Sequence, residues 1–503
     1  MQIGRICVVG ILTGLFLQQG FTQTVVYVSP SGSDSNSGTL SQPFKTISKG
    51  LTAIGTNGTV YLRGGLYLLG SSKLSLSKSG QSGSLIKIWA YPGETPILDC
   101  TGNTSDGISI SGNYYHLKGI EERNAGHNGI NISGNNNLIE NCVVHDNQNT
   151  GLHLTGSAPP GPSNNLILNC DAYLNYDPPI GGNADGFSAK WTIGPNNVFR
   201  GCRAFNNSDD GWDLWMGTST VVIDSCFAFR NGVDSWHSGS FDGNGNGFKL
   251  GGNFVPTPHI VRNCVSFDNA GNGGRGFDEN NNTAGQTLFN CTAYRNKGDN
   301  YHFKNVVVDS QSHVLKDCIS FDGAVAISSG ILEKNSWQGF TVSGSDFLSL
   351  DTAEVTTPRN PDGTLQVRRF LHLAPGSGMI DAGVNVGLPY SGSAPDLGAF
   401  ESGLVTTSVT QVGIASQEFK LDMNYPNPFN PKTAISYQLV ANSFVSLRVF
   451  DALGREVATL ATGYQSAGPH RVEFDGAALA SGAYFARLQS GNETKTIRLL
   501  LTK

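Results

Sequence analysis

The sequence predicts an all-β protein, built mainly as a right-handed parallel β-helix solenoid and followed by a small antiparallel β-sandwich. A six-residue phrase that begins with cysteine and usually ends with asparagine recurs through the middle of the chain, and it stops before a differently patterned C-terminal region. Glycine accounts for 64 of the 503 residues and charged residues for only 14%. This composition favours many short strands joined by tight turns over long surface helices.

The repeated phrase predicts the solenoid. Its seven copies begin at Cys142, Cys170, Cys202, Cys226, Cys264, Cys291 and Cys318, and these cysteines are 28, 32, 24, 38, 27 and 27 residues apart. That spacing fits one coil of a solenoid, and the alternation of small or apolar with polar residues in each copy predicts a strand. Stacking at about 4.8 Å per coil would give a column of buried cysteines and a ladder of asparagines. The cysteines are expected to stay unbridged, because stacked parallel side chains do not readily adopt the disulfide dihedral angle.

A second strand is predicted in each coil, where a glycine or asparagine precedes a large residue, as in Gly211-Trp212 and Gly247-Phe248. The large residue should point inward and the next residue outward, exposed, because side chains alternate along a strand. Aligning the coils gives an outward column of His153, Ser188, Asp213, Lys249, Asp278 and His302. Lys249 is therefore predicted to lie beside Asp213.

Four aspartates gather around this column on successive coils. Asp185 and Asp210 each precede the glycine, Asp209 adjoins Asp210, and Asp213 belongs to the column itself. The flanking coils carry long insertions, which solenoids place on a binding face. Crowded carboxylates need a cation, and an all-oxygen ligand set without histidine or cysteine predicts Ca²⁺. The alternatives are aspartates that only cap turns and a Lys249 that only forms an exposed ion pair.

A lysine beside such a cation indicates a proton transfer. Its ordinary pKa of about 10.4 makes it a poor base near neutrality, but a nearby positive charge lowers that pKa. A cation bound to a uronate carboxylate would also acidify the adjacent carbon-bound hydrogen. The residues therefore predict β-elimination with Lys249 as the base. A uronate hydrolase or carbon-5 epimerase, and a noncatalytic, calcium-stabilised, glycan-binding surface solenoid, remain as alternatives.

Three motifs of this region resemble family 9 of the polysaccharide lyases, which are calcium-dependent pectate lyases with a parallel β-helix fold. They are Asn183-Ala-Asp-Gly-Phe187, Ser208-Asp-Asp-Gly-Trp-Asp213 and Asn246-Gly-Phe-Lys249. The resemblance runs from Val25 to Glu401 and implies pectate or polygalacturonate as substrate, the four aspartates as Ca²⁺ ligands and Lys249 as base. Arg275 and Trp236 are candidates for substrate contacts, and Trp191 and Trp215 are open between sugar stacking and packing.

The C-terminal region has motifs of its own. Tyr425-Pro-Asn-Pro-Phe-Asn-Pro431 and Ser481-Gly-Ala-Tyr-Phe-Ala-Arg-Leu488 resemble the sorting domain of the type IX secretion system. The resemblance implies that the secretion machinery is a partner of this domain. A carbohydrate-binding module of similar shape is the alternative interpretation.

The N-terminus predicts export. Arg5 precedes an apolar run from Ile6 to Leu17 that is too short to span a bilayer and is typical of a signal peptide. The predicted division is a signal peptide (1–23), the catalytic β-helix (24–401), a linker (402–417) and the sorting β-sandwich (418–503). The net charge of -6 gives no basic surface for nucleic acid. We expect a secreted or cell-surface monomer.

Overall fold

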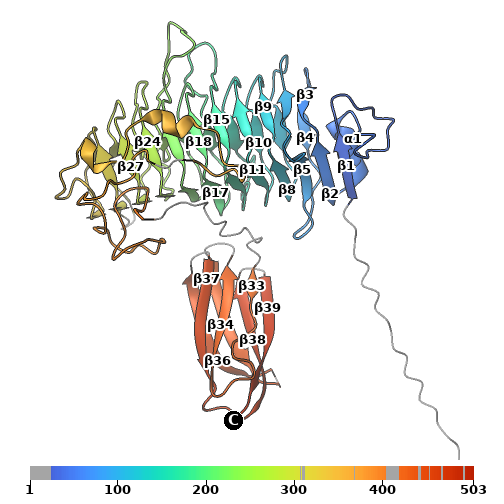
Figure 1. Cartoon of the computed structure of the whole chain (residues 1–503), viewed down its shortest axis with the longest axis vertical. Helices are drawn as coiled ribbons and strands as arrows, with labels where there is room; N and C mark the ends of the chain where they lie inside the picture. The colour runs from blue at the N-terminus through green and yellow to red at the C-terminus, as the bar shows by residue number, and fades with distance from the viewer. Residues whose placement is uncertain are drawn as a thin grey trace, which may run out of the picture.

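A computed structural model of the chain describes residues 24–305, 307–308, 312–366, 369–403, 419–439, 443–452, 454–465, 468–490 and 493–503. These residues form a solenoid of parallel strands and a separate antiparallel sandwich, which confirms the predicted fold class (Figure 1). The predicted signal peptide and most of the predicted linker lie outside the described residues. No helix in the described part of the chain has the length and apolarity to cross a membrane.

Three parallel sheets form the β-helix, and each complete coil gives one strand to each sheet. Sheet A contains β1 (Thr24–Val28), β2 (Gly58–Leu62), β5 (Ile86–Ala90), β8 (Tyr115–Lys118), β11 (Leu138–Glu140), β14 (Leu166–Leu168), β17 (Asn197–Arg200), β20 (Val221–Asp224), β23 (Ile260–Arg262), β26 (Thr287–Phe289), β29 (Val314–Lys316) and β32 (Ile331–Glu333).

Sheet B contains β3 (Gly65–Leu68), β6 (Pro96–Asp99), β9 (Glu121–Arg123), β12 (Val143–His145), β15 (Asp171–Tyr173), β18 (Arg203–Phe205), β21 (Phe227–Phe229), β24 (Val265–Phe267), β27 (Thr292–Tyr294) and β30 (Ile319–Phe321). Sheet C contains β4 (Leu74–Leu76), β7 (Ile108–Ile110), β10 (Ile130–Ile132), β13 (Leu152–Leu154), β16 (Phe187–Ala189), β19 (Trp212–Asp213), β22 (Phe248–Lys249), β25 (Phe277–Asp278), β28 (Tyr301–Phe303) and β31 (Val325–Ile327).

The sequence pattern predicts two of these three strands in each coil and misses the strand of sheet A. That strand ends just before the cysteine, as β14 does before Cys170. It is only three to five residues long, and in β14 all three residues are apolar, so no alternation marks it. The predicted phrase itself is the turn from sheet A followed by the strand of sheet B.

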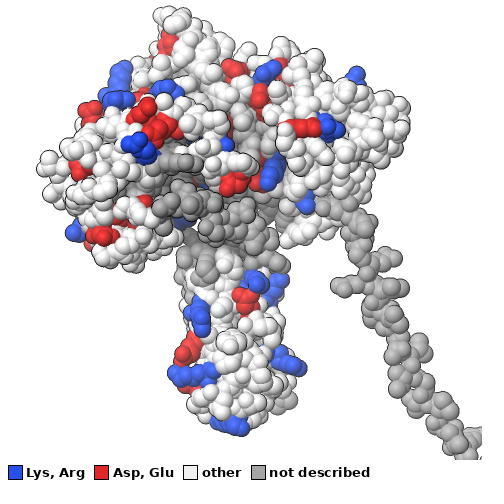
Figure 2. Space-filling model, viewed as in Figure 1, with Lys and Arg blue, Asp and Glu red and all other residues white. Residues whose placement is uncertain are grey.

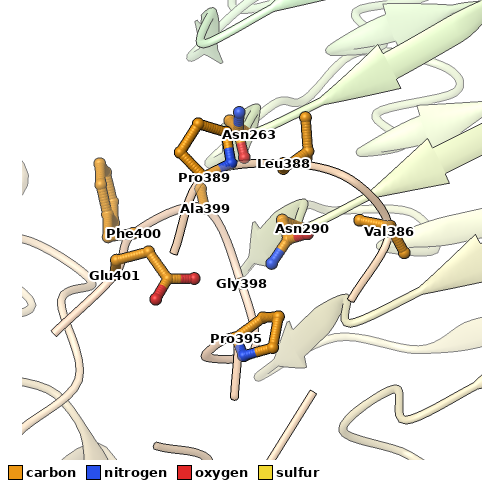
Figure 3. A pocket seen from close by; sticks show the side chains of 10 residues that line it. All are labelled: Asn263, Asn290, Val386, Leu388, Pro389, Pro395, Gly398, Ala399, Phe400 and Glu401. Atoms are coloured by element: carbon orange, nitrogen blue, oxygen red, sulfur yellow. The ribbon is translucent and has the colours of Figure 1, made fainter. Parts of the chain in front are cut away.

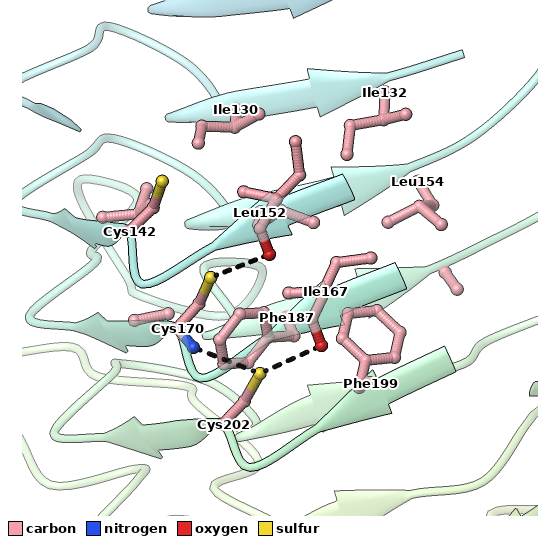
Figure 4. Packing of buried hydrophobic residues seen from close by; sticks show 14 of the residues in the cluster. Ile130, Ile132, Cys142, Leu152, Leu154, Ile167, Cys170, Phe187, Phe199 and Cys202 are labelled. Atoms are coloured by element: carbon pink, nitrogen blue, oxygen red, sulfur yellow. Dashed lines mark hydrogen bonds between the residues drawn. The ribbon is translucent and has the colours of Figure 1, made fainter. Parts of the chain in front are cut away.

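The cysteine column and the asparagine ladder form as predicted. All the cysteines in the described residues are buried and free of disulfides. Figure 4 shows Cys142, Cys170 and Cys202 stacked in the core, where the backbone N–H of Cys170 donates to the Sγ of Cys202 at 3.5 Å. The asparagine side chains donate to one another along the helix at 2.8–3.1 Å, through Asn147, Asn175, Asn207, Asn231, Asn269 and Asn296. Asn296 in turn donates to Asn300 of the same coil at 2.9 Å, and the Asn300 side chain lies against Gly323, where the next copy of the phrase has glycine in place of asparagine.

Sheet C presents its large residues to the interior, as predicted. Phe187, Trp212, Phe248, Phe277 and Tyr301 are fully buried and stack with ring centroids 4.8–5.1 Å apart. Each ring therefore fixes the rotation of its strand, and the residue that follows the ring points away from the core.

Non-repeating segments precede and follow the coils of the β-helix in the sequence, and both pack against it. At the N-terminal end, α1 (Ile47–Ile54) begins at Thr46, whose side chain accepts from the N–H of Lys49, and packs against β1 and β2. After β32, a strap of residues 334–366 and 369–403 carries the short helices η1 (Gly344–Asp346) and η2 (Thr352–Thr356) and packs on sheet B. In Figure 1 the strap is the orange segment.

A buried ion-pair network holds the strap on sheet B. Asp171 of β15 pairs with Arg203 of the next strand at 2.6 Å and with Arg359 of the strap at 2.5 Å. Arg203 also donates to the carbonyl of Val355 at 2.7 Å. Because both guanidinium groups are largely buried, loss of the Asp171 carboxylate would leave two uncompensated charges.

The C-terminal sandwich has two antiparallel sheets. One contains β33 (Lys420–Leu421), β34 (Lys432–Leu439) and β37 (Gly468–Asp475), and the other contains β36 (Glu456–Gln465), β35 (Ser443–Phe450), β38 (Gly482–Ser490) and β39 (Glu493–Leu501). Its buried residues, among them Phe429, Tyr437 and Leu488, form a cluster of their own. This confirms the predicted small antiparallel β-sandwich.

Candidate active site and metal centre

Sheet C places the predicted outward column in register. Ser188 pairs with Asp213, Asp213 with Lys249, and Lys249 with Asp278. One expectation about this column is wrong: five of its six side chains are buried, with Asp213 2% and Lys249 8% exposed, and His302 is half-buried. They point away from the core, but neighbouring side chains pair with them, as Lys190 and Lys249 do with Asp213.

Two insertions meet beside the coil of β19. The loop after β15 and the loop after β21 are joined by a hydrogen bond from the N–H of Asp242 to the carbonyl of Ile180 at 2.8 Å. Trp236, in the second loop, stacks on Tyr176 in the first with ring centroids 4.7 Å apart. The observed contact of Trp236 is therefore with the other insertion.

The four predicted aspartates converge at this point. Asp185, Asp209, Asp210 and Asp213 are all buried, and one carboxylate oxygen of each lies within 4.8 Å of the others. Asp213 comes from β19, while the other three come from the turns that lead into β16 and β19. The turns that lead into these strands thus bring aspartates of two successive coils to one point.

Backbone N–H groups orient the carboxylates. Those of Asn244 and Asn246 donate to Asp209 and Asp210, both at 2.7 Å, and that of Trp215 donates to Asp213 at 2.9 Å. In each of these three aspartates Oδ1 is the acceptor, which leaves Oδ2 for other partners. The second long insertion, which contains Asn244 and Asn246, therefore shapes the cluster directly.

Lys249 contacts two of the aspartates. Its Nζ lies 3.2 Å from Oδ2 of Asp213, in a hydrogen bond, and 3.0 Å from Oδ2 of Asp210. The contact with Asp210 is an ion pair only, because Oδ2 of Asp210 accepts no hydrogen bond with acceptable geometry.

Lys190 is a second lysine in the cluster, and the sequence analysis missed it. Its Nζ lies 2.8 Å from Oδ2 of Asp185 and 2.7 Å from Oδ2 of Asp213. A signal was present in the sequence, because Lys190 comes two residues after Ser188 of the outward column and should share its face. The expectation of one lysine among the four carboxylates is corrected to two.

The cluster carries an excess of negative charge. Four carboxylates and two ammonium groups give a formal charge of -2. Burial, and then the neighbouring carboxylates, raise the pKa of Asp209 and of Asp210, and burial raises the pKa of Asp185 to about 7 despite Lys190. Burial alone would raise the pKa of Asp213 as well, but the charges of Lys190 and Lys249 lower it.

These residues fit a calcium ion. The ligand atoms are all oxygens, lie close enough to share one ion, and include an Asp210 oxygen that lacks a proper hydrogen bond. One divalent cation would also balance the formal charge of -2. No histidine or cysteine belongs to this group, so its chemistry does not favour zinc.

Other predicted contact residues have partners of their own. Arg275 pairs with Asp278 at 2.9 Å, and its side chain remains 32% exposed.

Trp191 is 45% exposed and adopts a φ of 58°, which a bulky residue rarely does. Its ring meets Trp215 edge-on at 6.3 Å, and a Cβ at Gly252 would overlap the Trp215 indole. Trp191 follows Lys190 in sequence and Trp215 donates its backbone N–H to Asp213, so this aromatic pair adjoins the aspartate cluster.

A small pocket elsewhere lacks comparable chemistry. It lies between turns of the β-helix at Asn263 and Asn290 and the strap, and Glu401 is the one charged residue that lines it (Figure 3). The Glu401 carboxylate accepts the N–H groups of Ser391 and Asp396 at 3.2 and 3.1 Å, so it organises the strap. Figure 2 likewise shows blue and red groups scattered on one face of the molecule, with no extended patch of one sign.

The comparisons with known proteins identify relatives of both regions. The family model "Pel9A-like, right handed beta helix region" matches residues 26–313, and the model "Secretion system C-terminal sorting domain" matches residues 423–502. Pectate lyase L of Dickeya dadantii is 39% identical over 394 residues, covering 76% of this chain and 91% of its own. Pectate lyase L of Paenibacillus polymyxa is 39% identical over 389 residues, covering 72% and 84%.

Two solved structures are similar over most of their length. The crystal structure of pectate lyase Pel9A matches with a TM-score of 0.71 and 39% identity, covering 76% of this chain and 97% of that one. A structure titled rhamnogalacturonan lyase matches with a TM-score of 0.62 and 30% identity, covering 70% and 96%. At 39% and 30% identity, both structures are similar to this chain in sequence as well as in fold.

Proposed function

The chain belongs to the Pel9A-like family of right-handed β-helices, and from this premise we propose that it is a calcium-dependent pectate lyase that cleaves polygalacturonate by β-elimination. Its similarity to pectate lyases over most of the chain identifies the protein as a polysaccharide lyase. The observation that carries the finer proposal is the position of Lys249, whose Nζ lies 3.0–3.2 Å from two carboxylates of a cluster that fits calcium.

The proposed ligands of the ion are Asp185, Asp209, Asp210 and Asp213. When bound, calcium would supply positive charge that holds a uronate carboxylate and makes the hydrogen on carbon 5 more acidic. The protein's own contribution is to keep four carboxylates fixed by N–H donors before the ion arrives, so little ordering is needed on binding.

Lys249 is the proposed base. As the free amine it takes the proton from carbon 5, and the electron pair of that bond forms the double bond between carbons 4 and 5. The bond from carbon 4 to the glycosidic oxygen breaks, and the oxygen leaves with its electron pair and is protonated from solvent. No water attacks the sugar, which distinguishes this reaction from hydrolysis.

The protonation state of Lys249 depends on the charge around it. Burial disfavours the ammonium form, but the charges of Asp210, Asp213, Asp209 and Asp185 outweigh burial and raise the pKa of Lys249 well above its ordinary value. A lysine in that state cannot accept a proton. Neutralising the carboxylates with a cation would lower this pKa, so calcium dependence and proton abstraction are coupled in the proposal.

The remaining residues are proposed to position substrate. Lys190 would hold Asp185 and Asp213 in place, while Lys249 contacts Asp210 and Asp213, and Lys190 receives no role in proton transfer. Arg275 would contact a substrate carboxylate from one coil further on, in exchange for part of its interaction with Asp278. Trp236 would line the cleft from the insertion after β21, with Tyr176 supporting its ring.

Export follows from the C-terminal region. The matched sorting domain indicates secretion beyond the cell, and we infer the type IX route with the secretion machinery as partner. The signal peptide proposed for residues 1–23 would carry the chain across the first membrane. We propose that the protein acts as a monomer.

The test is product chemistry. The full chain is incubated with polygalacturonate in calcium and in excess chelator, and ultraviolet absorbance of the unsaturated product is followed beside the release of reducing ends. The proposal expects both signals in calcium and neither in chelator. Reducing ends without absorbance would indicate a hydrolase, and no signal in calcium would favour a glycan-binding solenoid. A rhamnogalacturonan arm is needed because of the second structural relative, and absorbance only in that arm would overturn the proposed substrate.

A further inference from the structure

A second group of potential metal ligands lies on sheet C beyond the aspartate cluster. Asp278 of β25 and His302 of β28 are register partners, and Glu279 follows Asp278 in sequence. One ligand atom from each of these three residues lies within 4.8 Å of the others. The group sits one coil beyond Lys249, which pairs with Asp278, and it shares no residue with the candidate calcium site.

Glu279 supplies the observation that points to a ligand. The residue is 1% exposed. Its Oε1 accepts hydrogen bonds from the N–H groups of Lys304 and Asn305 and from the Asn305 side chain, at 2.8, 3.0 and 2.8 Å. Its Oε2 is buried and accepts no hydrogen bond from the described part of the chain. A buried carboxylate oxygen without a partner is unfavourable, and a cation would satisfy it.

His302 is oriented as metal-binding histidines are. Its Nδ1 lies 2.6 Å from Oδ2 of Asp299, and its side chain is 13% exposed. A carboxylate on one ring nitrogen fixes the tautomer and the ring direction, and it leaves Nε2 with its lone pair as the ligand atom. Asp299 thus orients His302, and the ligand atom of His302 lies close to those of Asp278 and Glu279.

The local charge also fits a divalent ion. Asp278 accepts from Arg275 at 2.9 Å and from the N–H of Asn280 at 3.0 Å, one donor on each oxygen, so each oxygen keeps a second lone pair. Asp278, Glu279 and Asp299 contribute three negative charges and Arg275 one positive charge. With a neutral imidazole the formal charge is -2.

We propose that Asp278, Glu279 and His302 bind one divalent transition-metal ion of the zinc class. An imidazole combined with carboxylates favours zinc, manganese or cobalt, whereas the all-oxygen aspartate cluster favours calcium. The ion joins the coil of β25 to the coil of β28, and Glu279 extends the connection to the backbone at Lys304 and Asn305. This inference does not depend on the proposed lyase activity.

The experiment is a calorimetric titration of Zn²⁺ into untagged, full-length protein that has been stripped with chelator and then saturated with calcium. The wild-type protein is expected to show one tight zinc site and a higher thermal unfolding midpoint with zinc. Glu279→Gln and His302→Ala should each weaken that site at least tenfold. His127→Ala is the matched control, because His127 also pairs with an aspartate, at 2.8 Å, but belongs to neither cluster, and this variant should bind zinc as the wild type does.

Three results would overturn the proposal. They are the absence of a tight zinc site in the wild type, unchanged zinc binding in both Glu279→Gln and His302→Ala, and loss of that binding in Asp210→Asn, which would assign zinc to the calcium cluster. Glu279→Gln preserves side-chain volume, so it keeps the test decisive if His302→Ala fails to fold. Failure of the zinc site would leave the pectate lyase proposal untouched, since that proposal is tested by product absorbance.

Discussion

The interior and the outer face of the same coils follow different rules. Inside, each column repeats one kind of residue, as in the cysteines, the asparagines and the stacked rings of sheet C. On the outer face of sheet C the residue changes from coil to coil, through His153, Ser188, Asp213, Lys249, Asp278 and His302. Repetition thus marks the positions that packing constrains, and the break in repetition marks the site.

The two regions also differ in how polar groups are satisfied. Within the ladder, as at Asn231, each asparagine side chain accepts from one neighbour and donates to the next, so these buried polar groups are satisfied without any charge. In the aspartate cluster four carboxylates meet two ammonium groups, which leaves a formal charge of -2. A stability defect should therefore follow damage to the first region, and a defect in activity or metal binding should follow damage to the second.

The largest effect is expected at the base. Lys249→Ala removes the group that accepts the carbon-5 proton, and general bases contribute about 10²–10⁴-fold to rate. We expect kcat on polygalacturonate to fall by that amount with the thermal midpoint nearly unchanged. Lys190→Ala is the matched variant, because Lys190 contacts the same cluster, and its kcat should fall much less. Equal losses in the two variants would contradict the assignment of the base.

A break in the asparagine ladder should act on stability. Asn207 accepts from Asn175 at 2.8 Å and donates to Asn231 at 3.0 Å, and all three side chains are buried. Asn207→Ala removes the buried oxygen that accepts from the Asn175 backbone and side chain, together with one donor to Asn231, and should lower the free energy of unfolding by about 2–4 kcal/mol. The exposed Asn272→Ala should cost less than about 0.5 kcal/mol. Denaturant unfolding compares them, and similar values would contradict the role of the ladder.

The charge imbalance predicts a pH dependence of the ion-free protein. The pKa of Asp185 is raised to about 7, mainly by burial, so its contribution to stability is full below the ordinary value of 3.8 and is lost as the pH rises through about 7. In chelator the thermal midpoint should fall between pH 4 and 7, and calcium should flatten this slope. Asp185→Asn should flatten it as well, while the exposed Asp362→Asn should not. A midpoint that rises with pH across this window in chelator would reject the account.

An effect of the same sign is expected at Glu122, the one acidic residue at an inward position of β9. It is fully buried at the N-terminal end of the ladder, accepts from Asn147 at 3.1 Å, and has its pKa raised to about 8, mainly by burial. Stability should fall as the pH rises from 4.5 to 8. Glu122→Gln should remove this fall and gain about 1–3 kcal/mol at pH 9 relative to pH 5. Its half-buried neighbour provides the control variant Glu121→Gln, and an equal pH dependence in both variants would refute the assignment.

Much of the fold, and which site residues pair across neighbouring strands, could be predicted from the sequence. In a solenoid, residues at equivalent positions of successive repeats lie next to one another in space. The pairing of Asp213 with Lys249 follows from the glycine and ring that precede each of them. The strap could not be predicted, since Arg359 meets Asp171 across 188 residues with no repeat to relate them.

Lys190 and the burial of the column needed three-dimensional information. Lys190 lies on the predicted face, but its alignment with Asp185 and Asp213 depends on how a long side chain folds back over the next coil. Lys249 is buried while paired with Asp210 and Asp213, and the alternation of residues along a strand gives its direction but not its exposure.

The most direct test of the central claim is a calorimetric titration of calcium into chelator-stripped protein, for the wild type, Asp210→Asn and Lys249→Ala. The account predicts one tight site in the wild type, at least tenfold weaker binding in Asp210→Asn, and binding at least as tight as wild type in Lys249→Ala, because that variant loses a competing positive charge. Calcium binding that is unchanged in Asp210→Asn, or lost in Lys249→Ala, would contradict a cation held by the aspartates beside a lysine base.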